Sequence, residues 1–198
     1  MFAANRGLTF PDYLEYDDGT DNFYELVDGA LVEVTPASPL HSDIAEFLDR
    51  TFYAAVERAK LSWKVKRSDT GVRTGSNRSR LPDVCVLKRD DWEQLRQQQS
   101  KSAVLRVPLL LAVEIVSPGE QNYRRDYIEK RADYQQRHIP EYWIVDPHEG
   151  KVTLHLLQDD LFYPELPVVF EGDAVISSPM LTQLDLSLTV AEVLDPDI

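Results

Sequence analysis

The apolar run "LLLAVEIV", residues 109–116, constrains the fold more than any other segment of the chain. Seven of its eight residues are apolar, which is typical of a β-strand covered on both faces rather than one with a face in water. Glu114 interrupts the run. A buried ionised carboxylate is costly unless it finds a cation or takes up a proton. The run therefore predicts a layered fold. It also predicts that Glu114 has a specific partner, a cation or a proton.

The segments before this strand predict a hairpin, a helix and two strands. "YELVDGALVEV" (24–34) predicts a β-hairpin, because Asp28 and Gly29 tolerate the positive φ of a tight turn. The segment 35–60 predicts an amphipathic helix with Ser38 and Pro39 at its start. Residues 63–74 and 81–87 predict two strands joined by a polar turn, and 89–99 a short surface helix. The expected buried face of the long helix consists of Leu40, Ile44, Phe47, Leu48, Thr51, Phe52, Ala55 and Val56.

The segments after the strand predict a second helix and a second hairpin. In "SPGEQNYRRDYIEKRADYQQRH", Ser117 and Glu120 have the spacing of a capping box, and the alternative is an irregular turn with the helix starting near Tyr123. Residues 141–146 and 151–157 predict a hairpin, and the remainder predicts short strands. The expected fold class is α/β or α+β, with a central mixed sheet flanked by helices. We expect one domain over 1–198, comprising an N-terminal extension and hairpin (1–37), a core (38–146) and a C-terminal β extension (147–198).

The composition predicts a cytoplasmic protein without a membrane segment. No apolar run approaches the roughly 20 residues that span a bilayer. The N-terminal residues lack the basic start and apolar block of a signal peptide, and the single Cys85 suits a reducing compartment. The net charge of −13 argues against a nucleic-acid partner. However, the segment from Lys64 to Arg80 holds six basic residues and one acidic residue, so it is either a local phosphate-binding strip or a solvated loop.

Two carboxylates stand on neighbouring predicted strands. Asp83 follows Pro82 at the start of one strand, and Glu114 lies inside the next long strand. Such a pair can converge on Mg²⁺, which is typically held by one or two carboxylates with waters and phosphate oxygens, and the backbone carbonyl of Ile115 could add an oxygen. In the alternative, Asp83 caps a turn and Glu114 pairs with an arginine.

Six blocks in order give the chain a resemblance to a known family. They are "YELVDG", "SPLHSDIAEFL", "LPDVCVL", "LAVEIVSPGE", "YIEKRADYQQRHIPEYWIVDP" and "GDAVISSPMLTQLDLSL". Together they resemble the Uma-two family of the PD-(D/E)XK nuclease superfamily, over about residues 8–194. The resemblance implies a restriction-endonuclease-like core and hydrolysis of phosphodiester bonds, with Mg²⁺ or Mn²⁺ as cofactor and DNA as the expected substrate.

The resemblance also implies where the third catalytic residue lies. The superfamily pattern has a lysine two residues after the glutamate, where this chain has Val116. In the Uma-two pattern a helical lysine is thought to replace it, and the match here is Lys130. Lys130 is three residues after Tyr127 and four before Tyr134, so all three share a helix face. The alternative is an exposed ion pair between Lys130 and Asp126.

Three further residues are candidates of lower rank. Glu25 matches a recurring family position and either adds a metal carboxylate or faces solvent on the hairpin. His41 either contacts substrate phosphate or makes a structural hydrogen bond. Arg73, inside the basic segment, is a candidate phosphate contact.

The leading hypothesis is therefore a Mg²⁺-dependent endonuclease. Asp83 and Glu114 would bind the metal and Lys130 would assist the attacking water. The competing hypothesis is a catalytically silent binding or regulatory module on the same fold, in which the carboxylates form a structural ion site. A homodimer is a further expectation, by analogy with the superfamily.

Overall fold

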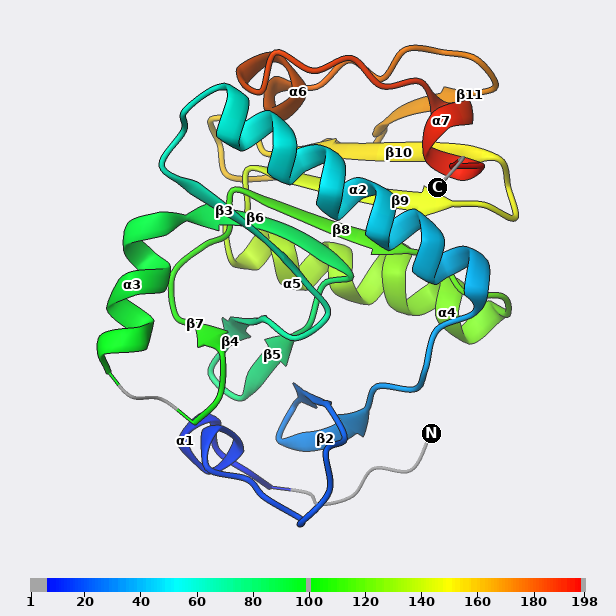
Figure 1. Ribbon diagram of the computed structural model, residues 1–198. Helices are drawn as coiled ribbons and strands as arrows, with labels where there is room; N and C mark the ends of the chain where they lie inside the picture. Colours follow the sequence, from blue (N-terminus) through cyan, green and yellow to red (C-terminus); the bar gives the residue numbers. More distant parts are fainter. Residues whose placement is uncertain (1–6, 99–100, 197–198) are drawn as a thin grey trace.

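A mixed six-stranded sheet forms the centre of the molecule (Figure 1). This computed structural model describes residues 7–98 and 101–196. Within this sheet, among the described residues, β8 and β9 pair in parallel and the other four pairs are antiparallel, which confirms the expected mixed sheet. In spatial order the strands are β11 (Val168–Glu171), β10 (Lys151–Leu156), β9 (Glu141–Asp146), β8 (Leu111–Ile115), β6 (Val84–Lys88) and β3 (Trp63–Arg67).

A second sheet of five short strands lies below the first in Figure 1. It contains the expected hairpin, whose turn residues Asp28 and Gly29 have φ of 49° and 78°. The strand predicted over 63–74 was wrong, because Ser68 has a φ of 49° and the chain leaves the first sheet there to join the second. The predicted turn 75–80 also contributes a strand. In spatial order the strands are β2 (Ala30–Glu33), β1 (Tyr24–Val27), β5 (Arg78–Arg80), β4 (Gly71–Gly75) and β7 (Val104–Leu105).

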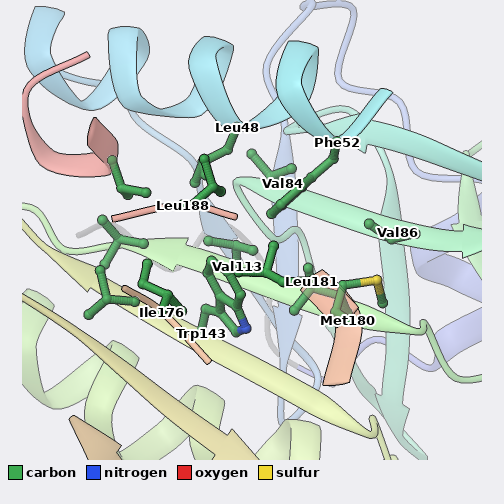
Figure 2. Packing of buried hydrophobic residues seen from close by; sticks show 14 of the residues in the cluster. Leu48, Phe52, Val84, Val86, Val113, Trp143, Ile176, Met180, Leu181 and Leu188 are labelled. Atoms are coloured by element: carbon green, nitrogen blue, oxygen red, sulfur yellow. The ribbon is translucent and has the colours of Figure 1, made fainter. Parts of the chain in front are cut away.

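The helix α2 (Pro39–Arg58) covers one face of the six-stranded sheet. Its N-cap is Ser38, as expected, and Leu48 and Phe52 pack over Trp143 of β9 (Figure 2). Leu40 was expected on the buried face but is 40% exposed, so the buried face starts at His41.

Two short helices, α6 (Pro179–Gln183) and α7 (Val190–Leu194), complete this face where only strands were expected. Their starts are fixed by the side chains of Ser178 and Thr189, which accept hydrogen bonds from the backbone of the first turn.

The opposite face is covered by a continuous helical segment made of α4 (Glu120–Arg124), η1 (Arg125–Lys130) and α5 (Arg131–Gln136). Its N-cap is Gly119, with a φ of 111° and no side-chain cap. The capping box at Ser117 was therefore wrong, since Gly119 is the N-cap. The alternative of an irregular turn is confirmed for residues 117–119, but the helix begins at Glu120 rather than near Tyr123. The η1 turn is a π-helix, a form often found at functional sites.

Two other helices lie at the periphery, α1 (Phe10–Leu14) and α3 (Arg89–Gln97), the latter at the predicted surface helix. None of the helices within the described residues is both long enough and apolar enough to cross a bilayer.

Candidate active site

The strand register places Asp83 and Glu114 on the same face of the six-stranded sheet. Along β8 the residues that pack toward α2 alternate with residues that face the α4–α5 segment, and Glu114 belongs to the second set. Strands β6 and β8 pair Val84 with Val113 and Cys85 with Ala112. One further step along this antiparallel register brings Asp83 opposite Glu114. The two carboxylates predicted from the sequence thus lie together beneath the helix that carries Lys130.

Glu114 is 1% exposed and has two proton donors from the helix. Its Oε2 accepts a hydrogen bond from Nζ of Lys130 at 2.7 Å, and its Oε1 accepts a short hydrogen bond from the hydroxyl of Tyr134. Loss of solvent raises the pKa of Glu114 to about 8, since the opposing charge of Lys130 is partly offset by neighbouring carboxylates. The partner of the glutamate is a lysine, so the alternative of an arginine pair was wrong.

Lys130 is buried between two carboxylates. Its Nζ lies 2.7 Å from Glu114 Oε2 and 3.2 Å from Glu25 Oε1. Burial lowers the pKa of Lys130, but the surrounding carboxylates outweigh it, and the pKa is above its usual value. The alternative of an exposed ion pair with Asp126 was wrong, because Lys130 is 4% exposed and Asp126 binds Arg125 instead.

Asp83 has one bonded and one open carboxylate oxygen. Its Oδ2 accepts a hydrogen bond from the backbone N–H of Ile115 at 2.7 Å and lies 3.1 Å from Nε2 of His41. Within residues 7–98 and 101–196, its Oδ1 accepts no hydrogen bond, and the side chain is 20% exposed. Burial raises the pKa of Asp83, but His41, Lys130 and the Ile115 N–H outweigh it, so the pKa is below its usual value. Asp83 is therefore ionised, with one oxygen free to bind a ligand.

His41 holds Asp83 from the first turn of α2. Burial lowers the pKa of His41. The hydrogen bond to Asp83 and the charges of Asp83 and Asp126 raise it by more than burial lowers it, so the net shift is upward. Of the two roles expected for His41, the geometry provides the structural hydrogen bond. Its Nδ1 is buried without a hydrogen-bond partner.

Glu25 is buried at 4% exposure and binds cations on both oxygens. Its Oε2 accepts from Nη1 of Arg80 at 2.8 Å, while its Oε1 accepts from the Leu81 N–H at 3.0 Å and faces Lys130. Burial would raise the pKa of Glu25, but Lys130 and Arg80 lower it to about 2. Glu25 is thus neither solvent-facing nor free. In the described part of the chain, no three His, Cys, Asp or Glu side chains are grouped so that they could hold a metal.

The basic segment from Lys64 to Arg80 does not form one strip, because its halves belong to different sheets. Arg80 is 2% exposed and is bonded to Glu25 and to Asp133, the latter at 2.6 Å. Arg73 donates hydrogen bonds to the carbonyls of Gly75 and Ser76 in its own turn. Neither of these bonds involves Asp83 or Glu114.

The donor set fits a divalent cation with two protein carboxylates. Asp83 offers a free oxygen, and Glu114 adds a second carboxylate, whose two oxygens also contact Lys130 and Tyr134. One or two carboxylates plus waters is the usual protein share of a Mg²⁺ site. A cavity of about 460 Å³ adjoins this region, between the hairpin and the helical segment. Its lining residues are Val27, Val32, Arg80, Glu120, Gln121, Arg124, Arg125 and Glu129.

Sequence reasoning missed three members of this cluster. Tyr134 was used only to orient the helix, although its spacing of four residues from Lys130 places both on one face. Asp126 was considered only as an exposed partner, yet it is fully buried. Arg80 was assigned to the basic strip, and no local signal identified its bond to Glu25, 55 residues away in the sequence.

Comparisons with known proteins agree with this architecture. A solved structure described as a putative nuclease belonging to DUF820, from Anabaena variabilis ATCC 29413, superposes with a TM-score of 0.74. The match covers 95% of this chain and 98% of that chain at 16% sequence identity, which establishes the restriction-endonuclease-like fold alone. No curated protein sequence matches the chain. The family model described as "Putative restriction endonuclease" matches residues 10–191, and the chain therefore belongs to this family, Uma2.

Proposed function

We propose that this protein is a metal-dependent endonuclease that hydrolyses phosphodiester bonds of nucleic acid, with DNA as the substrate. The observation that carries the proposal is the buried contact between Lys130 and Glu114 beside the open oxygen of Asp83. The three side chains come from separate elements, and a lysine is not needed there to fold a sheet. Membership of a family of putative restriction endonucleases supports the same activity.

Each residue then has a distinct role. Asp83 and Glu114 would hold Mg²⁺ or Mn²⁺, which when bound polarises a phosphoryl oxygen and lowers the pKa of a bound water. His41 and the Ile115 N–H keep one oxygen of Asp83 occupied and leave the other open. The ammonium of Lys130 has three donors, of which two meet carboxylates. Its third N–H would orient the attacking water or stabilise charge on the phosphoryl group.

A binding module without catalysis is the second candidate. It is favoured by the bonding of Glu25 and Glu114, whose four carboxylate oxygens all bind protein groups. The net charge of −13 also opposes tight binding of a polyanion. In this case Lys130 would serve only to neutralise buried carboxylates.

Cleavage assays separate the two candidates. Plasmid, single-stranded DNA and RNA are incubated with Mg²⁺ or Mn²⁺ and the wild-type protein, Glu114→Gln, or the control Glu57→Gln, whose side chain is 53% exposed on α2. We expect cleavage by wild type and control, and a loss of about 100-fold or more in Glu114→Gln. Cleavage that persists in Glu114→Gln refutes the site. Absence of cleavage on every substrate, with folded protein, favours the binding module.

The proposal includes a cytoplasmic setting and a homodimer. The single cysteine, Cys85, is buried and unpaired, which suits a reducing compartment. Light scattering on the purified protein would measure the mass of the particle, and a monomer at working concentration would rule out the dimer.

A further inference from the structure

One face of the α4–α5 segment meets three strands of the second sheet in succession. Lys130 and Asp133 lie three residues apart and face β1 and β5. Lys130 pairs with Glu25 of β1 at 3.2 Å, and Asp133 pairs with Arg80 of β5 at 2.6 Å. Both contacts join opposite charges, so the helix is fixed to these two strands by matched ion pairs.

The third position on the same face lacks this match. Arg137 follows Asp133 by one helical turn, and α5 packs beside β4, which carries Arg73 (Figure 1). Burial, and after it the charge of Arg73, lower the pKa of Arg137. Nε of Arg137 is buried and has no hydrogen-bond partner. Where the other strands face the helix with an opposite charge, β4 faces it with a like charge.

A third arginine joins this group through Phe10. The guanidinium carbon of Arg73 lies 4.4 Å from the centroid of the Phe10 ring, and that of Arg106 lies 5.8 Å from it. Among the residues that the structure describes, Arg106 and Arg137 form no ion pair or side-chain hydrogen bond. Arg73 donates only to the carbonyls of its own turn. The three guanidinium groups therefore carry no carboxylate partner.

This grouping is unexpected in a chain with 34 acidic and 21 basic residues. Like charges in proximity destabilise the folded state unless an anion joins them. The planar guanidinium group matches the geometry of two common anions, carboxylate and phosphate. A hollow of about 470 Å³ adjoins the turn to which Arg73 donates, and none of the three arginines lines it. It is lined by the turn Gly75–Arg78, by Gln136 beside Arg137, and by Asp28, whose carboxylate is already held by Arg78 at 2.6 Å.

We propose that Arg73, Arg106 and Arg137 bind a backbone phosphate of the nucleic acid, at a position separate from the bond that is cleaved. The identity of the ligand rests on the proposed nuclease function. Arg137 lies seven residues after Lys130, about 10 Å along the helix axis. The phosphate that it contacts is therefore a different one from the scissile phosphate.

The test measures binding rather than cleavage. In a Glu114→Gln background, the affinity for short fluorescein-labelled duplex DNA, single-stranded DNA and RNA is followed by anisotropy between about 50 and 200 mM salt. The test variant is Arg106→Gln/Arg137→Gln, which leaves Arg73 to hold its turn. The control is Arg50→Gln/Arg96→Gln, which makes the same charge change at exposed positions of α2 and α3.

We expect the slope of log K against log[salt] for duplex DNA to fall in magnitude by about 1 in the test variant, since the site neutralises one phosphate and each phosphate contributes about 0.9. The control should keep the wild-type slope. Arg106→Gln alone, at an exposed position, should lower the slope by a smaller amount and leave the melting temperature unchanged.

The outcomes separate this inference from the nuclease proposal. Equal slopes in the test variant and control, or no binding to any of the three ligands, overturn the inference, while cleavage that depends on Glu114 would still support a nuclease. A reduced slope in a protein that cleaves nothing supports the phosphate site and removes the nuclease.

Discussion

Replacement of Lys130 by methionine tests the electrostatics of the site directly. Methionine keeps most of the length of the side chain and removes its charge. The ammonium lies 2.7 Å from Glu114 and 3.2 Å from Glu25. After the change, Glu25 keeps Arg80 and the Leu81 N–H, whereas Glu114 keeps only the hydroxyl of Tyr134. The cost should therefore fall mainly on Glu114.

The magnitude follows from leaving a buried charge unpaired. Removal of one partner from a buried ion pair typically costs about 3–5 kcal/mol. We expect the loss for Lys130→Met to approach this value only above about pH 8, where Glu114, whose pKa is about 8, is ionised in the wild type. In the double variant Lys130→Met/Glu114→Gln the unpaired charge is absent, so the total loss should be smaller than the sum of the single losses by about 2–3 kcal/mol.

Urea denaturation above pH 8, followed by tryptophan fluorescence to which the buried Trp143 contributes, measures all four proteins of this cycle. A lower pH should reduce the cost of Lys130→Met, because Glu114 can then take up a proton and lose its charge. Additivity of the two single changes within about 0.5 kcal/mol would refute the coupling. Above pH 8, a cost below about 1 kcal/mol for Lys130→Met would show that the ammonium is not buried against carboxylates.

Three further outcomes are expected. Tyr134→Phe should cost about 1–3 kcal/mol in the same urea assay, since it leaves an oxygen of buried Glu114 without its donor; no cost would place Tyr134 outside the site. The pKa of Glu114 is raised from 4.5 to about 8 in the folded state. The contribution of protonated Glu114 to the free energy of unfolding is therefore complete below about pH 4.5 and is lost as the pH rises through 8. Wild type should therefore lose stability relative to Glu114→Gln between those values, and a parallel pH dependence would contradict the raised pKa. Leu48→Ala should cost about 2–5 kcal/mol and Leu40→Ala less than about 0.5, as judged by thermal melting, and equal costs would contradict the observed buried face.

The elements predicted correctly are those whose signals are local. The helix α2 has both a start signal at Ser38 and a continuous apolar face, and the β1–β2 hairpin has its turn residues in place. The segment 63–74 failed because both of its halves have strand character, and nothing local shows that they belong to different sheets. That division depends on the left-handed conformation of Ser68 and on which edge each half can pair with.

The site shows the same division between local and long-range information. The buried position of Glu114 could be read from the apolar run around it, and the spacing of Lys130 from Tyr134 indicated its direction. The pairing of Glu25 with Arg80 could not be predicted, because these residues meet only when the hairpin joins the second sheet. The resemblance named Glu25 as a candidate but not the cations that surround it.

Lys130 comes from a helix rather than from a strand, so the chemistry of the site depends on how that helix packs. Val116, where the superfamily pattern has lysine, lies on the same face of the sheet as Glu114 and packs in the core beneath the helix. The cation must then reach Glu114 across the contact between helix and sheet. The η1 turn is fixed there by the hydroxyl of Tyr142, which donates to the carbonyl of Asp126 at 2.8 Å. Asp133 fixes the next turn through its ion pairs with the second sheet. These bonds position the ammonium of Lys130 as well as the helix. A change such as Asp133→Asn should therefore weaken the contact between Lys130 and Glu114, although Asp133 itself does not bond to Glu114.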